Sequence, residues 1–178
     1  MTSNTQQTDD GKPLRPSEID KRLLERDAAR LFMRRYEYEF GQPMRHIWHN
    51  EPAKPDVSCY FQEQPLDLEI AHLYANENEA KCIAPRANDD PLWCHLQALT
   101  HIPPEQQVDE ALQRILSSKA AKHYHSERVW LVIRNASPHW QRQDFLLALE
   151  DIAIPPHSFE QIWLLPDFAG QQVLVRIA

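Results

Sequence analysis

Two acidic residues lie in segments of the chain that otherwise favour β-strands. Asp56 opens the segment 56–61, and Glu69 lies inside the segment 66–74. Acidic residues are depleted in strands because a carboxylate in a half-buried sheet is costly. The polar residues 62–65 indicate a turn that would join the two segments into a hairpin. Two carboxylates brought together by a hairpin can bind a divalent cation through hard oxygen ligands.

A simpler interpretation of these two acids stays open. Asp56 could cap a turn, and Glu69 could form an ion pair with an Arg or Lys from another part of the chain. The surrounding sequence must therefore decide whether the pair serves chemistry or structure.

The composition indicates one globular domain. The chain has 178 residues, of which 42% are hydrophobic, and it contains no apolar run long enough for a membrane span and no signal-peptide apolar region. We therefore expect a cytoplasmic protein without a membrane partner. Cys59, Cys82 and Cys94 form no closely spaced pair, which suits a reducing compartment. The three glycines argue against a Gly-rich phosphate loop.

The charge is unevenly distributed along the chain. The net charge of −7 counts against a generic nucleic-acid-binding protein. Residues 113–142, however, contain six Lys and Arg residues against one acid, Glu127. A local basic surface there could contact phosphates, and we expect Arg114, Lys122 and Arg128 to make such contacts. The alternative is that these cations simply belong to a solvated helix face and to strand ends.

The periodicity of apolar residues predicts an α/β domain over residues 17–178, preceded by a flexible arm at residues 1–16. Its mixed central sheet would be flanked by helices. The predicted helices cover 17–40, a short stretch from Pro91, 104–124 and 140–152; the predicted strands cover 44–50, 56–61, 66–74, 128–134, 161–165 and 173–177. Residues 75–90 are predicted to form a long loop, a feature that is usually functional or mobile.

This order of elements, with Pro55-Asp56 before one strand and Glu69 inside the next, resembles the PD-(D/E)xK nuclease superfamily. The resemblance implies a restriction-endonuclease-like αβββαβ core over residues 18–134, followed by a C-terminal helix and two strands. It also implies a metal-dependent nuclease acting on nucleic acid. Asp56, Glu69 and the carbonyl group of Ile70 would bind Mg²⁺ or Mn²⁺, and a glutamate of the first helix would complete the site. The residues that match this last position are Glu37 and Glu39.

The chain departs from the family pattern at one position. The family has a lysine two residues after the second acid, whereas this chain has Ala71. Some members of the family supply the cation from the following helix, where this chain has Lys119 and Lys122. Because Lys119 lies near the predicted inward face of that helix, we expect its ammonium group to point toward Asp56 and Glu69.

Other interpretations of the sequence lead to different classes of protein. The fold could be a catalytically decayed nuclease that serves as a nucleic-acid or protein interaction module, in contact with a protein partner or in a homo-oligomer. A zinc site is a weaker alternative because the spacing of its candidate ligands matches no standard pattern; these are Cys82, Cys94, His95 and His101. Cys94 and His95 form a poor nucleophile pair, since neighbours on a helix point apart.

Overall fold

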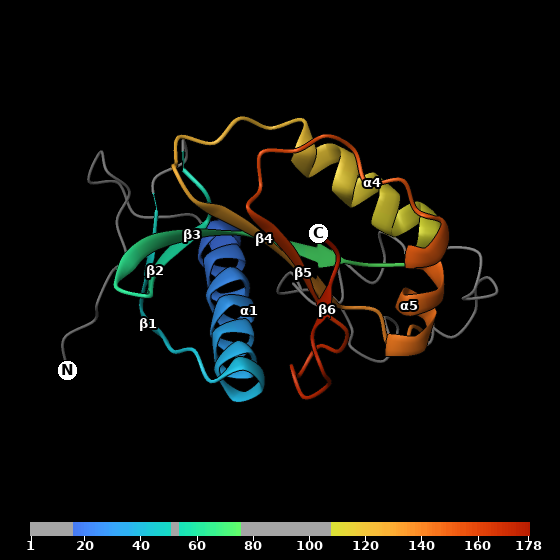
Figure 1. Cartoon of the computed structure of the whole chain (residues 1–178), viewed down its shortest axis with the longest axis horizontal. Coiled ribbons are helices and arrows are strands. Elements are labelled where there is room, and N and C mark those ends of the chain that lie inside the picture. Colours follow the sequence, from blue (N-terminus) through green and yellow to red (C-terminus); the bar gives the residue numbers. More distant parts are fainter. Residues whose placement is uncertain (1–15, 51–53, 76–107) are drawn as a thin grey trace.

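The structure of the protein is a computed structural model that describes residues 16–50, 54–75 and 108–178. Within these ranges the chain is an α/β fold with three helices and a six-stranded mixed sheet (Figure 1). In chain order the elements are α1 (Pro16–Phe40), β1 (Met44–His49), β2 (Val57–Phe61), β3 (Gln64–Leu73), α4 (Val108–Ala120), β4 (Val129–Asn135), α5 (Arg142–Asp151), β5 (Gln161–Leu165) and β6 (Val175–Arg176).

The sheet keeps the order of the chain, β1-β2-β3-β4-β5-β6. The pairs β1/β2, β2/β3 and β5/β6 are antiparallel, whereas β3/β4 and β4/β5 are parallel. Parallel neighbours require a crossover connection. The segments that contain α4 and α5 provide these two crossovers, and both helices lie on the same side of the molecule (Figure 1).

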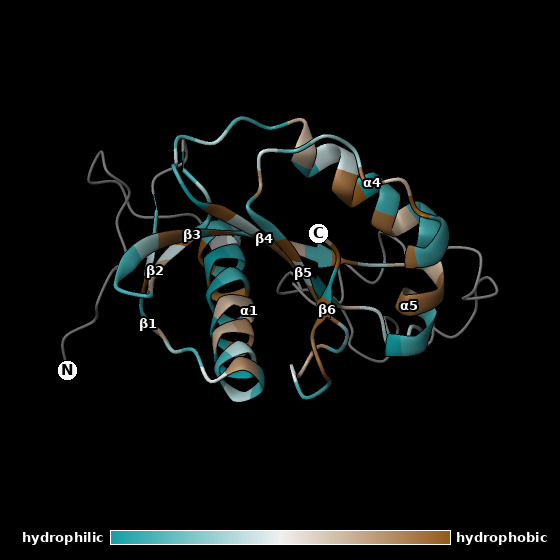
Figure 2. Ribbon diagram, in the orientation of Figure 1, coloured by the Kyte–Doolittle hydropathy of each residue, from teal (hydrophilic) through white to brown (hydrophobic). Residues whose placement is uncertain are grey.

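The sheet separates two apolar cores, and β3 faces both of them. Leu66, Leu68 and Ile70 pack with residues of α1, whereas Ala71 and Leu73 pack with residues of α4 and α5. Figure 2 shows apolar residues along the central strands, with hydrophilic and apolar residues alternating along the helices. Because side chains alternate across a strand, Glu69 projects to the side of α4. His72 projects to the opposite side, as expected from the sequence.

The hairpin turn between β2 and β3 is tighter than predicted. The prediction assigned residues 62–65 to the turn, but Gln64 and Pro65 belong to β3 and pair with Phe61 and Tyr60. Only Gln62 and Glu63 make the turn, both with positive φ (52° and 62°). Two residues of positive φ are the usual solution for a two-residue hairpin, because their twist matches that of the strands.

Both edges of the sheet are irregular or short. In β1 the register with β2 shifts between Arg45 and Trp48, and His46 has a positive φ of 55°. At the other edge, β6 contains two residues instead of the predicted 173–177. An extra residue in an edge strand bends that strand away from regular pairing.

Several predicted elements lie outside the described residues. These are the arm at 1–15, most of the loop at 75–90, the short helix from Pro91 and the start of the helix predicted at 104–124. In the described parts of the chain, no helix is both long enough and apolar enough to cross a membrane.

Candidate active site

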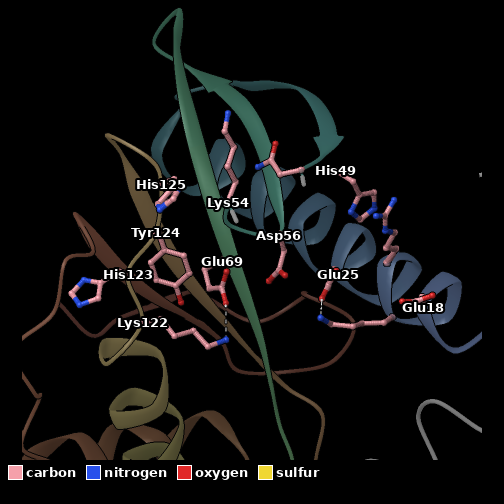
Figure 3. A pocket seen from close by; sticks show the side chains of 13 residues that line it. Glu18, Glu25, His49, Lys54, Asp56, Glu69, Lys122, His123, Tyr124 and His125 are labelled. Carbon is pink, nitrogen blue, oxygen red and sulfur yellow. Dashed lines mark ion pairs between the residues drawn. The ribbon is translucent and has the colours of Figure 1, made fainter. Parts of the chain in front are cut away.

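A hollow of about 540 Å³ opens where α1, the start of β2, the middle of β3 and the segment after α4 meet (Figure 3). Its volume falls within the range of ligand pockets, roughly 300–1,000 Å³. Thirteen residues line it, and most of them are charged or polar: Glu18, Lys21, Arg22, Glu25, His49, Asn50, Lys54, Asp56, Glu69, Lys122, His123, Tyr124 and His125.

Glu69 is the most buried acid of β3 and contacts two lysines. Its side chain is only 5% exposed, and Oε1 lies 2.5 Å from Nζ of Lys119 and 3.8 Å from Nζ of Lys122. The Lys119 ammonium also donates a hydrogen bond to the carbonyl oxygen of Ile70, at 3.1 Å. A buried carboxylate is tolerated when it is paired and hydrogen-bonded, and the end of α4 supplies that pairing here. The structure places Lys119 against Glu69, which fits both the simple ion pair and the expected lysine of the site, and its part in chemistry stays a prediction.

Asp56 lies beside Glu69 because of the register of the hairpin. The last pair between β2 and β3 on this side joins Val57 to Leu68, so the backbone of Ile70 lies beyond the end of β2. The N–H of Ile70 donates instead to Oδ2 of Asp56, at 2.9 Å. One residue of β3 thus directs its N–H to the first acid and its carbonyl oxygen to the ammonium of Lys119.

The third carboxyl group of the hollow is Glu25, which comes from α1 and was not predicted. It is 6% exposed, and Lys21 pairs with it at 3.2 Å. Burial, and next the negative charge of Asp56, raise the pKa of Glu25 to about 7. Figure 3 shows the carboxyl groups of Glu69, Asp56 and Glu25 following one another across the hollow, with Asp56 in the middle.

The sequence does contain a signal for Glu25. Helical spacing places position 25 on the same face as Ala28, Ala29 and Phe32, which are fully buried. An acid on the apolar face of a helix needs a polar partner. That pattern distinguishes Glu25 from the exposed charges of the same helix.

The surroundings in the hollow also shift the pKa of two further side chains, Tyr124 and His49. Burial, and next the negative charge of Glu69, raise the pKa of the Tyr124 hydroxyl. Burial, and next the positive charge of Arg22, lower the pKa of His49. At neutral pH the hollow therefore presents a neutral phenol and a neutral imidazole beside its carboxyl groups.

The donor set fits a small hard cation. Carboxylates of Asp56, Glu69 and Glu25 and the carbonyl oxygen of Ile70 are oxygen ligands of the kind that Mg²⁺ and Mn²⁺ prefer. Among the residues that the structure describes, however, no group of three His, Cys, Asp or Glu side chains is arranged to hold a metal ion. Two of the carboxyl groups are already engaged by lysines, since Lys119 pairs with Glu69 and Lys21 pairs with Glu25.

Glu37 and Glu39 lie at the other end of α1, and the structure does not bring them to the hollow. The guanidinium group of Arg45 makes a bidentate contact with the Glu37 carboxylate, with hydrogen bonds of 2.6 and 2.7 Å. Glu39 pairs with Arg35 and accepts a hydrogen bond from the N–H of Leu174. Twelve residues of helix separate Glu25 from Glu37, a distance of about 18 Å.

The predicted nucleic-acid contacts do not form one continuous surface. Lys122 lies at the rim of the hollow, whereas Arg114 is exposed on α4 and lines no described hollow. Arg128 pairs with Glu160 at 3.1 Å. Arg134, another cation of the basic segment, is 1% exposed and lies inside the protein. The positive charge available to a ligand is therefore smaller than the sequence indicates.

The candidate residues of the alternative zinc and nucleophile sites all lie outside the described residues. They are Cys82, Cys94, His95 and His101. Cys59 is buried, and burial raises the pKa of its thiol to about 12, which makes it a poor nucleophile.

No protein-family model, curated protein or solved structure matches this chain.

Proposed function

We propose that this protein is a metal-dependent phosphodiesterase of the PD-(D/E)xK type that hydrolyses nucleic acid. In this proposal α1, β1, β2, β3, α4 and β4 correspond to a restriction-endonuclease-like core, and α5, β5 and β6 extend it. The single observation that carries the proposal is the contact of the Lys119 ammonium with both Glu69 and the carbonyl oxygen of Ile70. It supplies, from α4, the positive charge that the family takes from the position of Ala71.

The spatial order of the polar groups supports the same proposal. Asp56 precedes β2, Glu69 lies in β3 and Lys119 comes from the helix that follows. The backbone of Ile70 touches Asp56 through its N–H and Lys119 through its carbonyl oxygen. Glu25 takes the place that the sequence assigned to Glu37 or Glu39, one carboxyl group from the first helix.

The chemistry follows from where negative charge develops. Hydrolysis of a phosphodiester places extra negative charge on the phosphoryl oxygens and on the leaving oxygen. A divalent cation held by Asp56, Glu69, Glu25 and the Ile70 carbonyl would offset that charge and lower the pKa of an attacking water. Lys119 adds a fixed positive charge beside Glu69 and orients that carboxylate. Lys122, which is 54% exposed, is placed to meet the phosphate backbone of a substrate.

The first test measures metal binding and hydrolysis together. Isothermal titration with Mn²⁺ should give binding by the wild type and much weaker binding by Asp56→Asn and Glu69→Gln. Hydrolysis of labelled single-stranded and double-stranded nucleic acid should depend on Mg²⁺ or Mn²⁺ and fall by at least about 100-fold in the same variants. Equal Mn²⁺ binding by wild type and Asp56→Asn would exclude this site.

The second test asks whether the lysine has moved from the strand to the helix. Lys119→Met should reduce hydrolysis by about 100-fold or more, since a preorganised positive charge is lost. Adding Ala71→Lys to that variant returns a lysine to the strand and should restore part of the activity. Lys122→Met is the matched control and should have a smaller effect. If the double variant folds and binds Mn²⁺ but stays as inactive as Lys119→Met, the two positions are not equivalent.

The alternative is a binding module with a decayed site, and the alanine at position 71 favours it. A decayed module would bind nucleic acid or a protein without metal-dependent hydrolysis in either test.

A further inference from the structure

A second hollow, of about 590 Å³, adjoins the first one on the face of β2 that is turned away from α1. Lys54 and His125 line both hollows, so the two are adjacent. The other residues of the second hollow include an aromatic side chain, a proline and an arginine: Trp48, Ser58, Gln64, Pro65, Asp67, Ser126, Glu127 and Arg128.

An exposed aromatic ring lines the second hollow, and another ring lies next to it. Trp48, which lines the hollow, is 40% exposed; Tyr60, which lines a neighbouring hollow, is 41% exposed, and the two ring centroids lie 5.5 Å apart. Their position follows from the alternation of β2. Val57, Cys59 and Phe61 point into the core under α1, so Tyr60 points to the other face, where Trp48 lies opposite Ser58.

Hydrogen bonds connect the linings of the two hollows. Ser58, which is 3% exposed, accepts a hydrogen bond from the side-chain amide of Asn50 at 2.6 Å. Its one hydroxyl hydrogen has two acceptors within reach, Oδ1 of Asn50 at 2.9 Å and a carboxylate oxygen of Asp67. Asn50 further donates to the carbonyl oxygen of Pro55, directly before Asp56. These contacts link β2, which carries Tyr60, to the segment that leads into Asp56.

Cations lie beside the rings and between the two hollows. Lys54 makes no ion pair within the described part of the chain, whereas Arg128 forms an ion pair with Glu160. Lys122 stands on the far side of the first hollow. Asp67 and Glu127 also line the second hollow and balance the charges of Lys54 and Arg128. The exposed ring is therefore the feature that favours a single strand, because every base has a π-face that can stack on a ring. A base inside a duplex is already stacked and cannot offer that face.

We propose that Trp48, backed by Tyr60, stacks against an unpaired base of a nucleic-acid substrate whose neighbouring phosphate reaches Asp56 and Glu69. The preferred substrate is then single-stranded nucleic acid or an unpaired end. This inference rests on the proposed phosphodiesterase function and adds the class of substrate to it.

The experiment compares single-stranded and duplex oligonucleotides bound by the full chain in EDTA, which suppresses hydrolysis. Fluorescence anisotropy gives the affinity, and a fluorescent purine analogue in the strand reports stacking through quenching. Trp48→Ala should weaken single-strand binding by roughly tenfold and abolish the quenching, whereas Trp48→Phe should retain both. Duplex binding should be unchanged. Tyr38→Ala is the matched control, since Tyr38 is an aromatic of α1 that is 79% exposed and lines neither hollow.

Each alternative outcome identifies a different failure. Single-strand affinity that is equal in wild type and Trp48→Ala, or an equal loss on duplex, overturns the stacking site. So does a dimer that becomes a monomer in Trp48→Ala without any change in oligonucleotide affinity, because a second copy of the chain would then be the occupant. Mn²⁺ titration and hydrolysis of the wild type report separately on the proposed function. If the wild type stacks bases but neither binds Mn²⁺ nor hydrolyses nucleic acid, the proposed enzyme function is wrong and the proposed binding surface stands.

Discussion

At the scale of single residues, the informative group is Glu25, because folding raises the pKa of its carboxyl group. Its pKa of about 7 lies well above the ordinary value of 4.5. Between these two pH values the folded chain binds more protons at this position than the unfolded chain does. The free energy of unfolding therefore falls as the pH rises from about 4.5 to about 7 through this group.

We predict that Glu25→Gln removes this contribution. Without metal, in EDTA, the loss of thermal stability between pH 5 and pH 8 should be smaller in the variant than in the wild type. Glu37→Gln is the control on the same helix, because Arg45 lowers the pKa of Glu37 and confines its effect to acidic pH. Melting curves by circular dichroism measure the difference. An identical pH dependence of wild type and Glu25→Gln would show that Glu25 is ionised throughout.

The acid pair of the hairpin could be found from the sequence, but the acid of the helix was harder to choose. Asp56 and Glu69 interrupt strand patterns that are visible in the sequence alone. The glutamate of α1 had to be chosen among several acids, and Glu37 and Glu39 were selected because they match the position implied by the family resemblance. Arg35 and Arg45 instead account for those two residues. The Arg35–Glu39 pair is an i,i+4 contact that helical spacing predicts, whereas the contact of Glu37 with Arg45 depends on the folded geometry.

At the scale of elements, α4 matters because it carries the lysine. Leu112 and Leu116 are buried against the sheet, and this packing fixes the end of the helix at which Lys119 lies. The spacing of these leucines predicts the inward face of the helix from the sequence alone. The packing of α4 therefore determines both the stability of the second core and the geometry of the candidate site.

We predict that Leu112→Ala lowers the free energy of unfolding by about 2–5 kcal/mol, because Leu112 is fully buried. Leu147→Ala in α5 makes the same chemical change at a side chain that is 55% exposed and should alter stability by about 0.5 kcal/mol or less. Urea denaturation of the two variants measures both values. Similar losses in the two variants would mean that α4 does not pack as the structure shows.

Element types were predictable, whereas the ends of several elements were not. The apolar run of β4 and the periodicity of α1 and α5 are local signals, and the structure has these elements within two residues of the predicted ends. The turn was predicted at 62–65 because these four residues separate the two strand-like segments. Pairing of Pro65 with Tyr60 depends on the partner strand, which local sequence does not describe.

At the scale of the whole molecule, the contrast is between an acidic chain and a locally basic rim. The net charge is −7, yet Lys122 stands at the mouth of the candidate site. In the sequence, every cation of residues 113–142 counts equally as a possible surface charge. Arg134 is buried and Arg128 is paired with Glu160, so fewer of these cations are available to a ligand. Only the tertiary structure reveals this reduction in available positive charge.

We predict that Lys122→Glu weakens binding of nucleic acid of any sequence and reduces the slope of log affinity against log salt concentration by about one. Arg128→Glu should have a smaller effect, since Glu160 already neutralises part of its charge. Arg142→Glu is the control, because that guanidinium donates to the carbonyl oxygen of Val173, away from both hollows. Equal salt slopes for wild type and Lys122→Glu would place the phosphates elsewhere.

The irregular edges of the sheet have a consequence for aggregation. A regular edge strand exposes a row of N–H and C=O groups onto which a strand of another molecule can add. Here the bulge around His46 disrupts that row in β1, and β6 is only two residues long. Neither edge offers a template for intermolecular strand addition. At high concentration, copies of this chain should therefore resist fibril growth for as long as the sheet stays folded.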